Sequence, residues 1–123
     1  MSLIVLFYSE DESVDADIFE KELNPDRSSV FGFESCRKSL WGHPYLKKLN
    51  LEYISRLDQE DIYVFDDDLK KLKRDLEIIL ENIQKIVEET NLTESFIEYR
   101  VLNALDYVRV AEKHKDKIGV YIG

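Results

Sequence analysis

Two long amphipathic segments, joined by a turn of about four residues, place the strongest constraint on how this chain folds. In the first, residues 69–89, apolar side chains recur at steps of three and four residues, which is the spacing of one face of an α-helix. The second, residues 94–114, repeats the pattern, and Thr93 precedes it as a candidate N-cap. Because the turn is short, the predicted helices must lie antiparallel, and each needs a partner surface for its apolar face.

Three short apolar runs supply that surface. Residues 3–8, 62–65 and 119–123 are rich in β-branched and aromatic side chains, and the continuous first run predicts a strand buried on both faces. We therefore expect an α+β fold: a small three-stranded mixed sheet with a long antiparallel helix hairpin packed on one face. The last strand should run antiparallel to the second. A chain of 123 residues fits a single domain, 1–123.

The rest of the chain is less regular. Residues 13–22 predict a short helix with Ser13 as its N-cap, and residues 45–51 predict another. Residues 26–61 are otherwise interrupted by glycine and proline. We expect the core between the helices and the sheet to contain these residues: Leu76, Ile79, Leu80, Ile83, Val101, Leu105 and Val108.

The charge of the chain points to a basic partner. With 17 basic and 26 acidic residues the net charge is −9, the opposite of what a nucleic-acid binder shows. Residues 10–22 hold seven acids and one base, and an exposed surface of that sign steers a basic protein towards it. The candidate interaction residues on this acidic face are Glu10, Asp11, Glu12, Asp15 and Asp17.

A basic, aromatic segment, residues 35–57, offers an alternative site. It holds five bases and one acid, and Arg37, Trp41 and His43, with Arg100 from the second long helix, are candidate ligand or interface residues. Two alternatives stay open. Trp41 is either a core anchor or an exposed interface residue. Arg100 and its helix neighbours Asn103 and Tyr107 either line a pocket or hydrogen-bond to residues 26–61.

The sequence predicts neither a catalytic nor a metal site. Acid clusters follow the first two strands, at 10–12 and 66–68, and in this they resemble the acidic pocket of response-regulator receiver domains. Those domains alternate strands with helices, whereas two long helices follow each other here. We expect the acids to be helix caps and solvated charges, with no metal and no cofactor. Cys36 and His43 lack a predicted orienting group, and with no catalytic motif present the chain is not expected to be an enzyme.

In size, acidity and aromatic content the chain resembles bacterial immunity proteins, which are small acidic proteins that neutralise cationic nuclease toxins. The resemblance implies a basic protein partner and assigns no site residues. The predicted function is an acidic protein-interaction module, of an immunity or inhibitor type; the alternative is a small-molecule or anion-binding domain that uses residues 35–57. Without a recognisable signal or membrane-spanning segment, we expect a cytoplasmic protein with no membrane partner.

Overall fold

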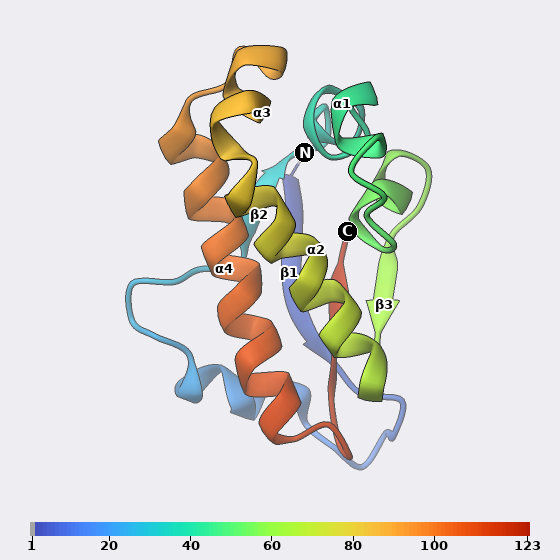
Figure 1. The fold of residues 1–123 in the computed structure, drawn as a ribbon. Coiled ribbons are helices and arrows are strands. Elements are labelled where there is room, and N and C mark those ends of the chain that lie inside the picture. The colour runs from blue at the N-terminus through green and yellow to red at the C-terminus, as the bar shows by residue number, and fades with distance from the viewer. Residues whose placement is uncertain (1) are drawn as a thin grey trace.

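A four-stranded antiparallel sheet forms one layer of the computed structural model, which describes residues 2–123 (Figure 1). The strands are β1 (Ser2–Tyr8), β2 (Val30–Phe33), β3 (Ile62–Val64) and β4 (Gly119–Ile122). Their order is β2-β1-β4-β3, and every neighbouring pair is antiparallel. The α+β class is therefore confirmed, as is the antiparallel pairing of β3 with β4. The expectation of a three-stranded mixed sheet was wrong, because β2 adds a strand and no pair of neighbouring strands described here is parallel.

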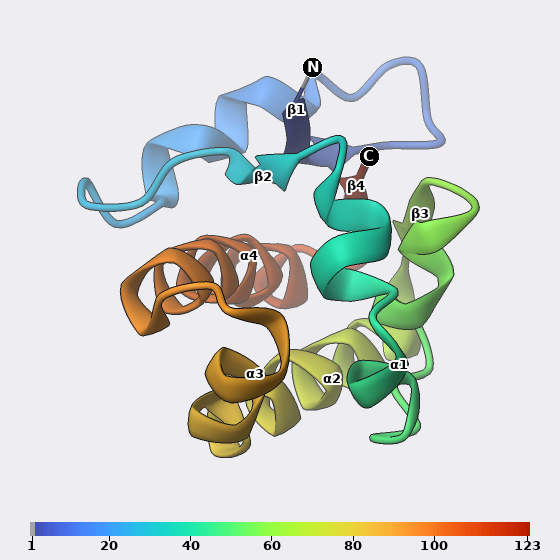
Figure 2. The same cartoon turned by 90° about the horizontal axis from the view of Figure 1, so that it is seen from above.

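The α-helices form the second layer, on one face of the sheet (Figures 1 and 2). The α-helices are α1 (Pro44–Lys47), α2 (Leu69–Glu81), α3 (Ile83–Thr90) and α4 (Glu94–Lys113). Shorter 3₁₀ or π turns are η1 (Ala16–Glu22), η2 (Arg37–Trp41), η3 (Ile54–Asp58) and η4 (Asp66–Asp68). The packing of α2 against α4 matches the expected hairpin only in part, since the first long helix is divided into α2 and α3.

The division falls at Asn82. Its backbone leaves the helical region (φ −109°, ψ 15°), and its side-chain Nδ2 donates to the Ile78 carbonyl at 2.8 Å. A polar side chain that bonds to the backbone in this way competes with the regular helix pattern. After α3, Asn91 adopts a left-handed conformation (φ 61°). Thr93 Oγ1 then accepts a hydrogen bond from the Phe96 N–H at 3.2 Å, which confirms the predicted N-cap of α4.

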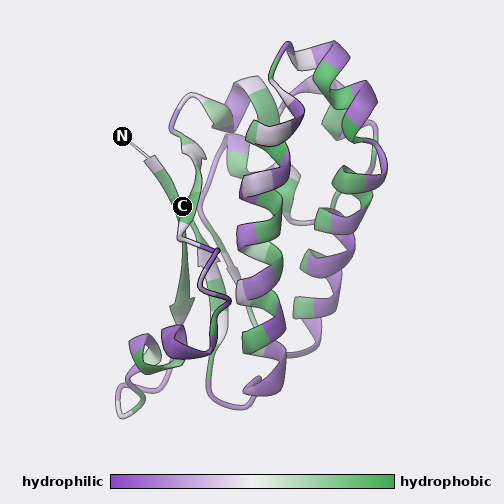
Figure 3. Cartoon of the chain, turned by 90° about the vertical axis from the view of Figure 1, so that its left-hand side faces the viewer, coloured by the Kyte–Doolittle hydropathy of each residue, from purple (hydrophilic) through white to green (hydrophobic). Residues whose placement is uncertain are grey.

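Only one face of β1 is buried, contrary to the expectation for residues 3–8. Leu3, Val5 and Phe7 face the helices and are buried, whereas Tyr8 on the other face is 41% exposed. Alternate residues of a strand point to opposite faces, and in the part of the chain that the structure describes the long helices lie on one side of the sheet alone (Figure 3). The apolar run is continuous because the outer face of β1 is also apolar, although the long helices do not cover it.

The additional strand, β2, was obscured by its glycine. Gly32 has φ 129°, a conformation that side chains rarely adopt, and a Cβ there would lie only 3.1 Å from Cys36 Sγ. The pairing of β2 with β1 shifts register between Leu3 and Ile4. A short strand with an internal glycine has little local signal, so its existence depends on the pairing with β1.

The two predicted short helices are also displaced. The first begins at residue 16, as the 3₁₀ turn η1, and its N-cap is Asp15, whose side chain accepts from the Asp17 N–H. Ser13 instead donates to Asp11, so its assignment as the cap was wrong. The second helix, α1, spans residues 44–47 and ends before the predicted boundary.

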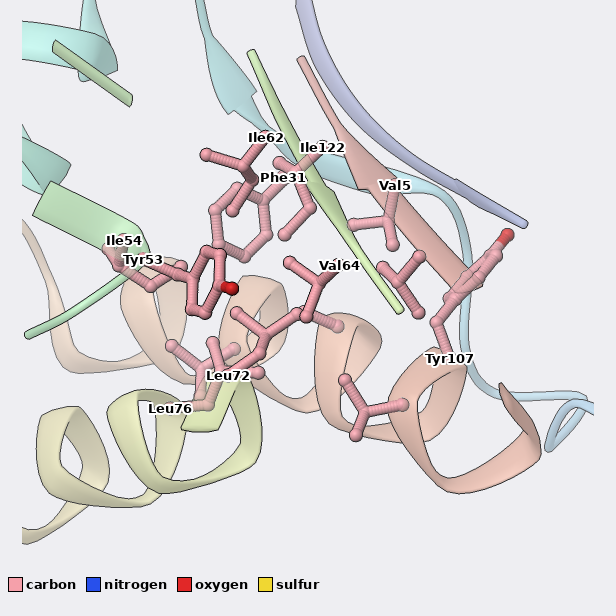
Figure 4. Close-up of a cluster of buried hydrophobic side chains, with 14 of the residues drawn as sticks. Val5, Phe31, Tyr53, Ile54, Ile62, Val64, Leu72, Leu76, Tyr107 and Ile122 are labelled. Carbon is pink, nitrogen blue, oxygen red and sulfur yellow. The ribbon is translucent and has the colours of Figure 1, made fainter. Parts of the chain in front are cut away.

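The core lies between the two layers (Figure 4). Strand residues such as Val5, Val64 and Ile122 meet Leu72 and Leu76 from α2, and all five are fully or almost fully buried. Of the seven residues expected in the core, five are buried: Leu76, Ile79, Ile83, Val101 and Val108. Leu80 and Leu105 are only partly buried.

A buried carboxylate fastens the irregular segment to α2. Asp75 is 3% exposed and accepts hydrogen bonds from the backbone N–H groups of Glu52, Tyr53 and Ile54, at 3.0, 2.7 and 3.0 Å. Burial raises the pKa of Asp75 above its usual value, although the three N–H donors act in the opposite direction. The side chain thus supplies acceptors for backbone groups that no strand or helix satisfies.

Candidate interaction surface

The acidic segment, residues 10–17, is a turn held in place by its own side chains. Ser9 Oγ donates to the Lys117 carbonyl at 2.8 Å, which ties the start of the turn to the loop before β4. Asp11 Oδ1 accepts from the Ser13 hydroxyl at 2.7 Å and from the Ser13 N–H at 2.9 Å. The hydroxyl bond, followed by the backbone bond, lowers the pKa of Asp11 below its usual value. The segment therefore presents ionised groups from a defined backbone.

All five predicted acidic-face residues are exposed: Glu10, Asp11, Glu12, Asp15 and Asp17. None of them forms an ion pair with any of residues 2–123. Ile18, directly after them, is 50% exposed. Glu22 differs, because it contacts His114 at 2.8 Å and Lys113 at 3.3 Å. The unpaired acids therefore end where η1 docks against α4.

The two acid clusters meet beside a small hollow of about 130 Å³, because β1 and β3 point the same way and end at the same edge. Glu10 and Asp11 line it from one side and Asp66 from the other. Lys115 and Lys117 line it as well, and their charges offset part of the acidity. Within residues 2–123, no cluster of three or more histidine, cysteine, aspartate or glutamate side chains is arranged to hold a metal ion.

In the basic segment, Arg37 is occupied by contacts within the chain. Its guanidinium bonds to Glu34 Oε1 at 2.5 Å and Asp61 Oδ1 at 2.6 Å, and to the carbonyls of Leu57 and Glu60 at 3.0 and 3.1 Å. Burial of the guanidinium lowers the pKa of Arg37, but the bonds to the two carboxylates outweigh it and leave the pKa above its usual value. Arg37 thus joins the irregular segment to the start of β3.

Trp41 is a core anchor. It is fully buried, stacks on Phe31 with ring centroids 4.2 Å apart, and donates from Nε1 to the Phe31 carbonyl at 3.2 Å. Its candidacy as a ligand or interface residue was therefore wrong, since it has no accessible surface. Tyr107 is also buried, with its ring tilted against that of Phe7 and the centroids 4.7 Å apart, and burial raises its pKa to about 12.

His43 and Cys36 both have structural contacts. His43 is the N-cap of α1, where its Nδ1 accepts from the Tyr45 N–H at 3.0 Å. Cys36 is 3% exposed, and its Sγ accepts from the Phe33 N–H at 3.4 Å. Cys36 Sγ and His43 Nδ1 thus take part in local structure, as an acceptor within a turn and as a helix cap.

Arg100 and Asn103 contact their surroundings rather than lining a pocket. Arg100 lies with its guanidinium carbon 3.5 Å from the Phe96 ring centroid and donates to the Phe96 carbonyl; burial lowers its pKa. Asn103 is fully buried. It accepts from the Ser28 N–H at 3.1 Å and donates to the Val30 carbonyl at 2.9 Å. The predicted contact with residues 26–61 is therefore confirmed for Asn103.

Sequence reasoning missed a row of aromatic side chains on the outer face of the sheet. Tyr63 and Tyr121 are paired across β3 and β4, and Leu6 is paired with Tyr121 across β1 and β4. Tyr8 lies at the end of β1, with its ring 5.2 Å from that of Tyr63. We call Tyr8, Tyr63 and Tyr121 the tyrosine row. The available signal was the alternation within residues 62–65 and 119–123. It places Tyr63 and Tyr121 on the face of the sheet opposite to that of the buried residues.

Comparisons with protein-family models, with curated proteins and with solved structures found no match to this chain. None of the helices in residues 2–123 combines the length and apolar character needed to cross a membrane.

Proposed function

We propose that this protein is an acidic interaction module that binds a basic protein partner through residues 10–17, in the manner of an immunity or inhibitor protein. The observation that carries the proposal is that five acids are exposed and make no ion pair within residues 2–123: Glu10, Asp11, Glu12, Asp15 and Asp17. Carboxylates that have no cationic partner within the protein keep their attraction for an approaching cationic surface.

The local structure also favours recognition. The bonds of Asp11 to Ser13 and of Ser9 to the loop before β4 limit how far the segment can rearrange, so less ordering entropy is lost when a partner binds. Exposed charges of one sign act mainly on the rate of encounter. We therefore assign to this segment the steering of the partner and the orientation of the complex.

The alternative function, anion binding by residues 35–57, has less support. The guanidinium of Arg37 already contacts four oxygen acceptors, and Trp41 is fully buried. An incoming phosphate or carboxylate would have to displace Asp61 and Glu34 from Arg37.

Charge reversal tests the proposal. The partner is captured from the native host on the immobilised protein and identified by mass spectrometry, and its binding kinetics are measured after purification. We expect a basic protein whose association with the variant Glu10→Lys, Asp11→Lys, Asp15→Lys and Asp17→Lys is slowed about tenfold or more. Raising the salt from about 50 to about 500 mM should remove most of this difference, because exposed charges are then screened.

A matched control separates a local site from overall charge. Four other acids are exposed on the helices and form no ion pair within residues 2–123: Glu77, Glu81, Glu89 and Glu98. Reversing these four to lysine changes the net charge equally and should alter the association rate by less than about threefold. Equal effects of the two variants, or a basic partner that binds equally well at both salt concentrations, would contradict the proposal.

A further inference from the structure

The outer face of the sheet is apolar where an open antiparallel sheet is ordinarily polar. Tyr8 and Tyr63 are 41% and 50% exposed. Together with Tyr121 and the aliphatic side chains of β1 they line a shallow hollow of about 360 Å³, whose lining residues are Ile4, Leu6, Phe7, Tyr8, Tyr63 and Tyr121. Within residues 2–123, α2, α3 and α4 lie on the opposite side of the sheet (Figures 2 and 3).

The rings form a continuous aromatic surface. Tyr63 lies 5.0 Å from Tyr121 and 5.2 Å from Tyr8, and Tyr8 lies 5.8 Å from Phe65, measured between ring centroids. Tyr8 can reach across β4 because its cross-strand neighbour is Gly119. A Cβ at Gly119 would lie 2.4 Å from Phe65 Cδ1, so the glycine also makes room for the Phe65 ring.

Acidic groups adjoin both ends of this surface. At one end, Glu10 follows Tyr8 by two residues, and Asp66 follows Phe65; both line the hollow at the strand ends, together with Lys115 and Lys117. At the other end, the Tyr121 hydroxyl donates to Asp61 Oδ2 at 2.8 Å. Asp61 also pairs with Arg37.

We propose that the tyrosine row is the contact surface for arginine side chains of the basic partner, with the carboxylates of Glu10 and Asp66 at one end favouring a cation there. This inference rests on the proposed function and adds to it the chemistry of the contact. Tyrosine faces attract a guanidinium through the ring quadrupole, and arginine is the cation that most often does so. The same geometry occurs within this chain, where the guanidinium carbon of Arg56 lies 4.5 Å from the Tyr53 ring centroid.

Charge selects this occupant over a second copy of the chain. Each copy carries a net charge of −9, so two copies repel each other overall, and like charges oppose association. Aromatic side chains dominate the affinity of interfaces, mainly through the dissociation rate. The acidic segment and the tyrosine row therefore have separable roles: the first accelerates encounter, and the second prolongs the complex.

The first experiment maps the surface on the full chain with an oligoarginine peptide of about nine residues as the probe, and an oligolysine peptide of equal length as its control. We expect oligoarginine to shift NMR amide signals on β1, β3 and β4 as well as in residues 10–17. Oligolysine should act mainly on residues 10–17. Shifts confined to residues 10–17 with both peptides would overturn the inference and leave the proposed function intact.

The second experiment removes the rings. Tyr8→Thr and Tyr63→Thr keep a side chain that favours strands and should together weaken oligoarginine binding about tenfold, while oligolysine binding changes by less than about twofold. Phe33→Thr is the matched control, because Phe33 is a strand aromatic that is 54% exposed and lies beside Phe96 instead of in the tyrosine row. It should leave both peptides unaffected.

The outcomes separate the two proposals. If neither peptide binds, both proposals fail. If reversal of the four acids weakens binding but the tyrosine variants do not, only the inference fails. Sedimentation that shows pairing of the chain with itself, lost in the tyrosine variants, would assign the row to a second copy and also overturn it.

Discussion

Single polar residues hold the irregular half of this chain in place. Asp75 accepts from the backbone N–H groups of residues 52–54. Arg37 donates to two backbone carbonyls, and Asn103 bonds to Ser28 and Val30. Buried backbone groups outside helices and strands must find such partners or lose the free energy of their hydrogen bonds with water. These side chains replace the pairing that secondary structure supplies elsewhere.

Asp75→Asn should therefore be costly. An amide has a single oxygen, so its NH₂ group would face at least one backbone donor that Asp75 now satisfies and would leave that N–H without its acceptor. We expect the free energy of unfolding to fall by about 2 kcal/mol or more, measured by urea denaturation. Glu77→Gln on the exposed side of the same helix is the control and should change it by about 0.5 kcal/mol or less. A similar small loss for Asp75→Asn would show that its three bonds contribute little.

At the scale of elements, the interruption at Asn82 decides how the helix layer covers the sheet. α2 packs along α4, and α3 contacts α1 as well as α4. A continuous helix over residues 69–89 would keep one straight apolar stripe, whereas the break redirects the second part. Leu80 lies next to the break and is only partly buried, which is why the periodicity overestimated its burial.

A pair of truncations tests this arrangement. Leu76→Ala, at a fully buried position, should reduce the free energy of unfolding by about 2–5 kcal/mol through lost burial and a new cavity. Leu80→Ala removes the same atoms from a partly solvated position and should cost about 2 kcal/mol or less. Urea unfolding of the two variants checks this. Equal losses would mean that Leu80 is as buried as Leu76 in solution, as in an unbroken helix.

For the whole molecule, paired carboxylates set the dependence of stability on pH. The bond to Arg37, followed by that to Tyr121, lowers the pKa of Asp61 below its usual 3.8. The bond to Lys47 lowers that of Asp58. A carboxyl whose pKa is lower in the folded state contributes stability above the pKa of the unfolded chain, and this is lost as the pH falls through the folded pKa. The contribution of Asp75 to this pH dependence has the opposite sign, because its pKa is raised in the folded protein.

Stability should therefore fall as the pH drops below about 4. In the variant Asp61→Asn the side chain cannot ionise, so its free energy of unfolding should be lower than that of the original protein at neutral pH. The difference between the two free energies should become smaller below the usual carboxyl pKa of 3.8. Urea unfolding at a series of pH values measures both curves. Glu60→Gln, beside it in the sequence, has no ion pair within the described chain and should show no such narrowing. If the difference in free energy of unfolding for Asp61→Asn stays constant with pH, the contribution of Asp61 to stability does not depend on its ionisation.

The sequence by itself determined the elements whose signals are local. Strand residues 3–8 and the Thr93 cap were predicted because propensity and capping act between neighbours. The acidic segment was predicted because five acids stand within residues 10–17.

Only the tertiary structure decided the rest. Trp41 is an anchor because Phe31 covers it, and β2 exists because β1 pairs with it. The tyrosine row joins residues 8, 63 and 121, which are far apart in the chain and become neighbours through the β1–β4–β3 pairing. Which face of that sheet stays open depends on where the helices pack, and this follows from long-range contacts that no local pattern encodes.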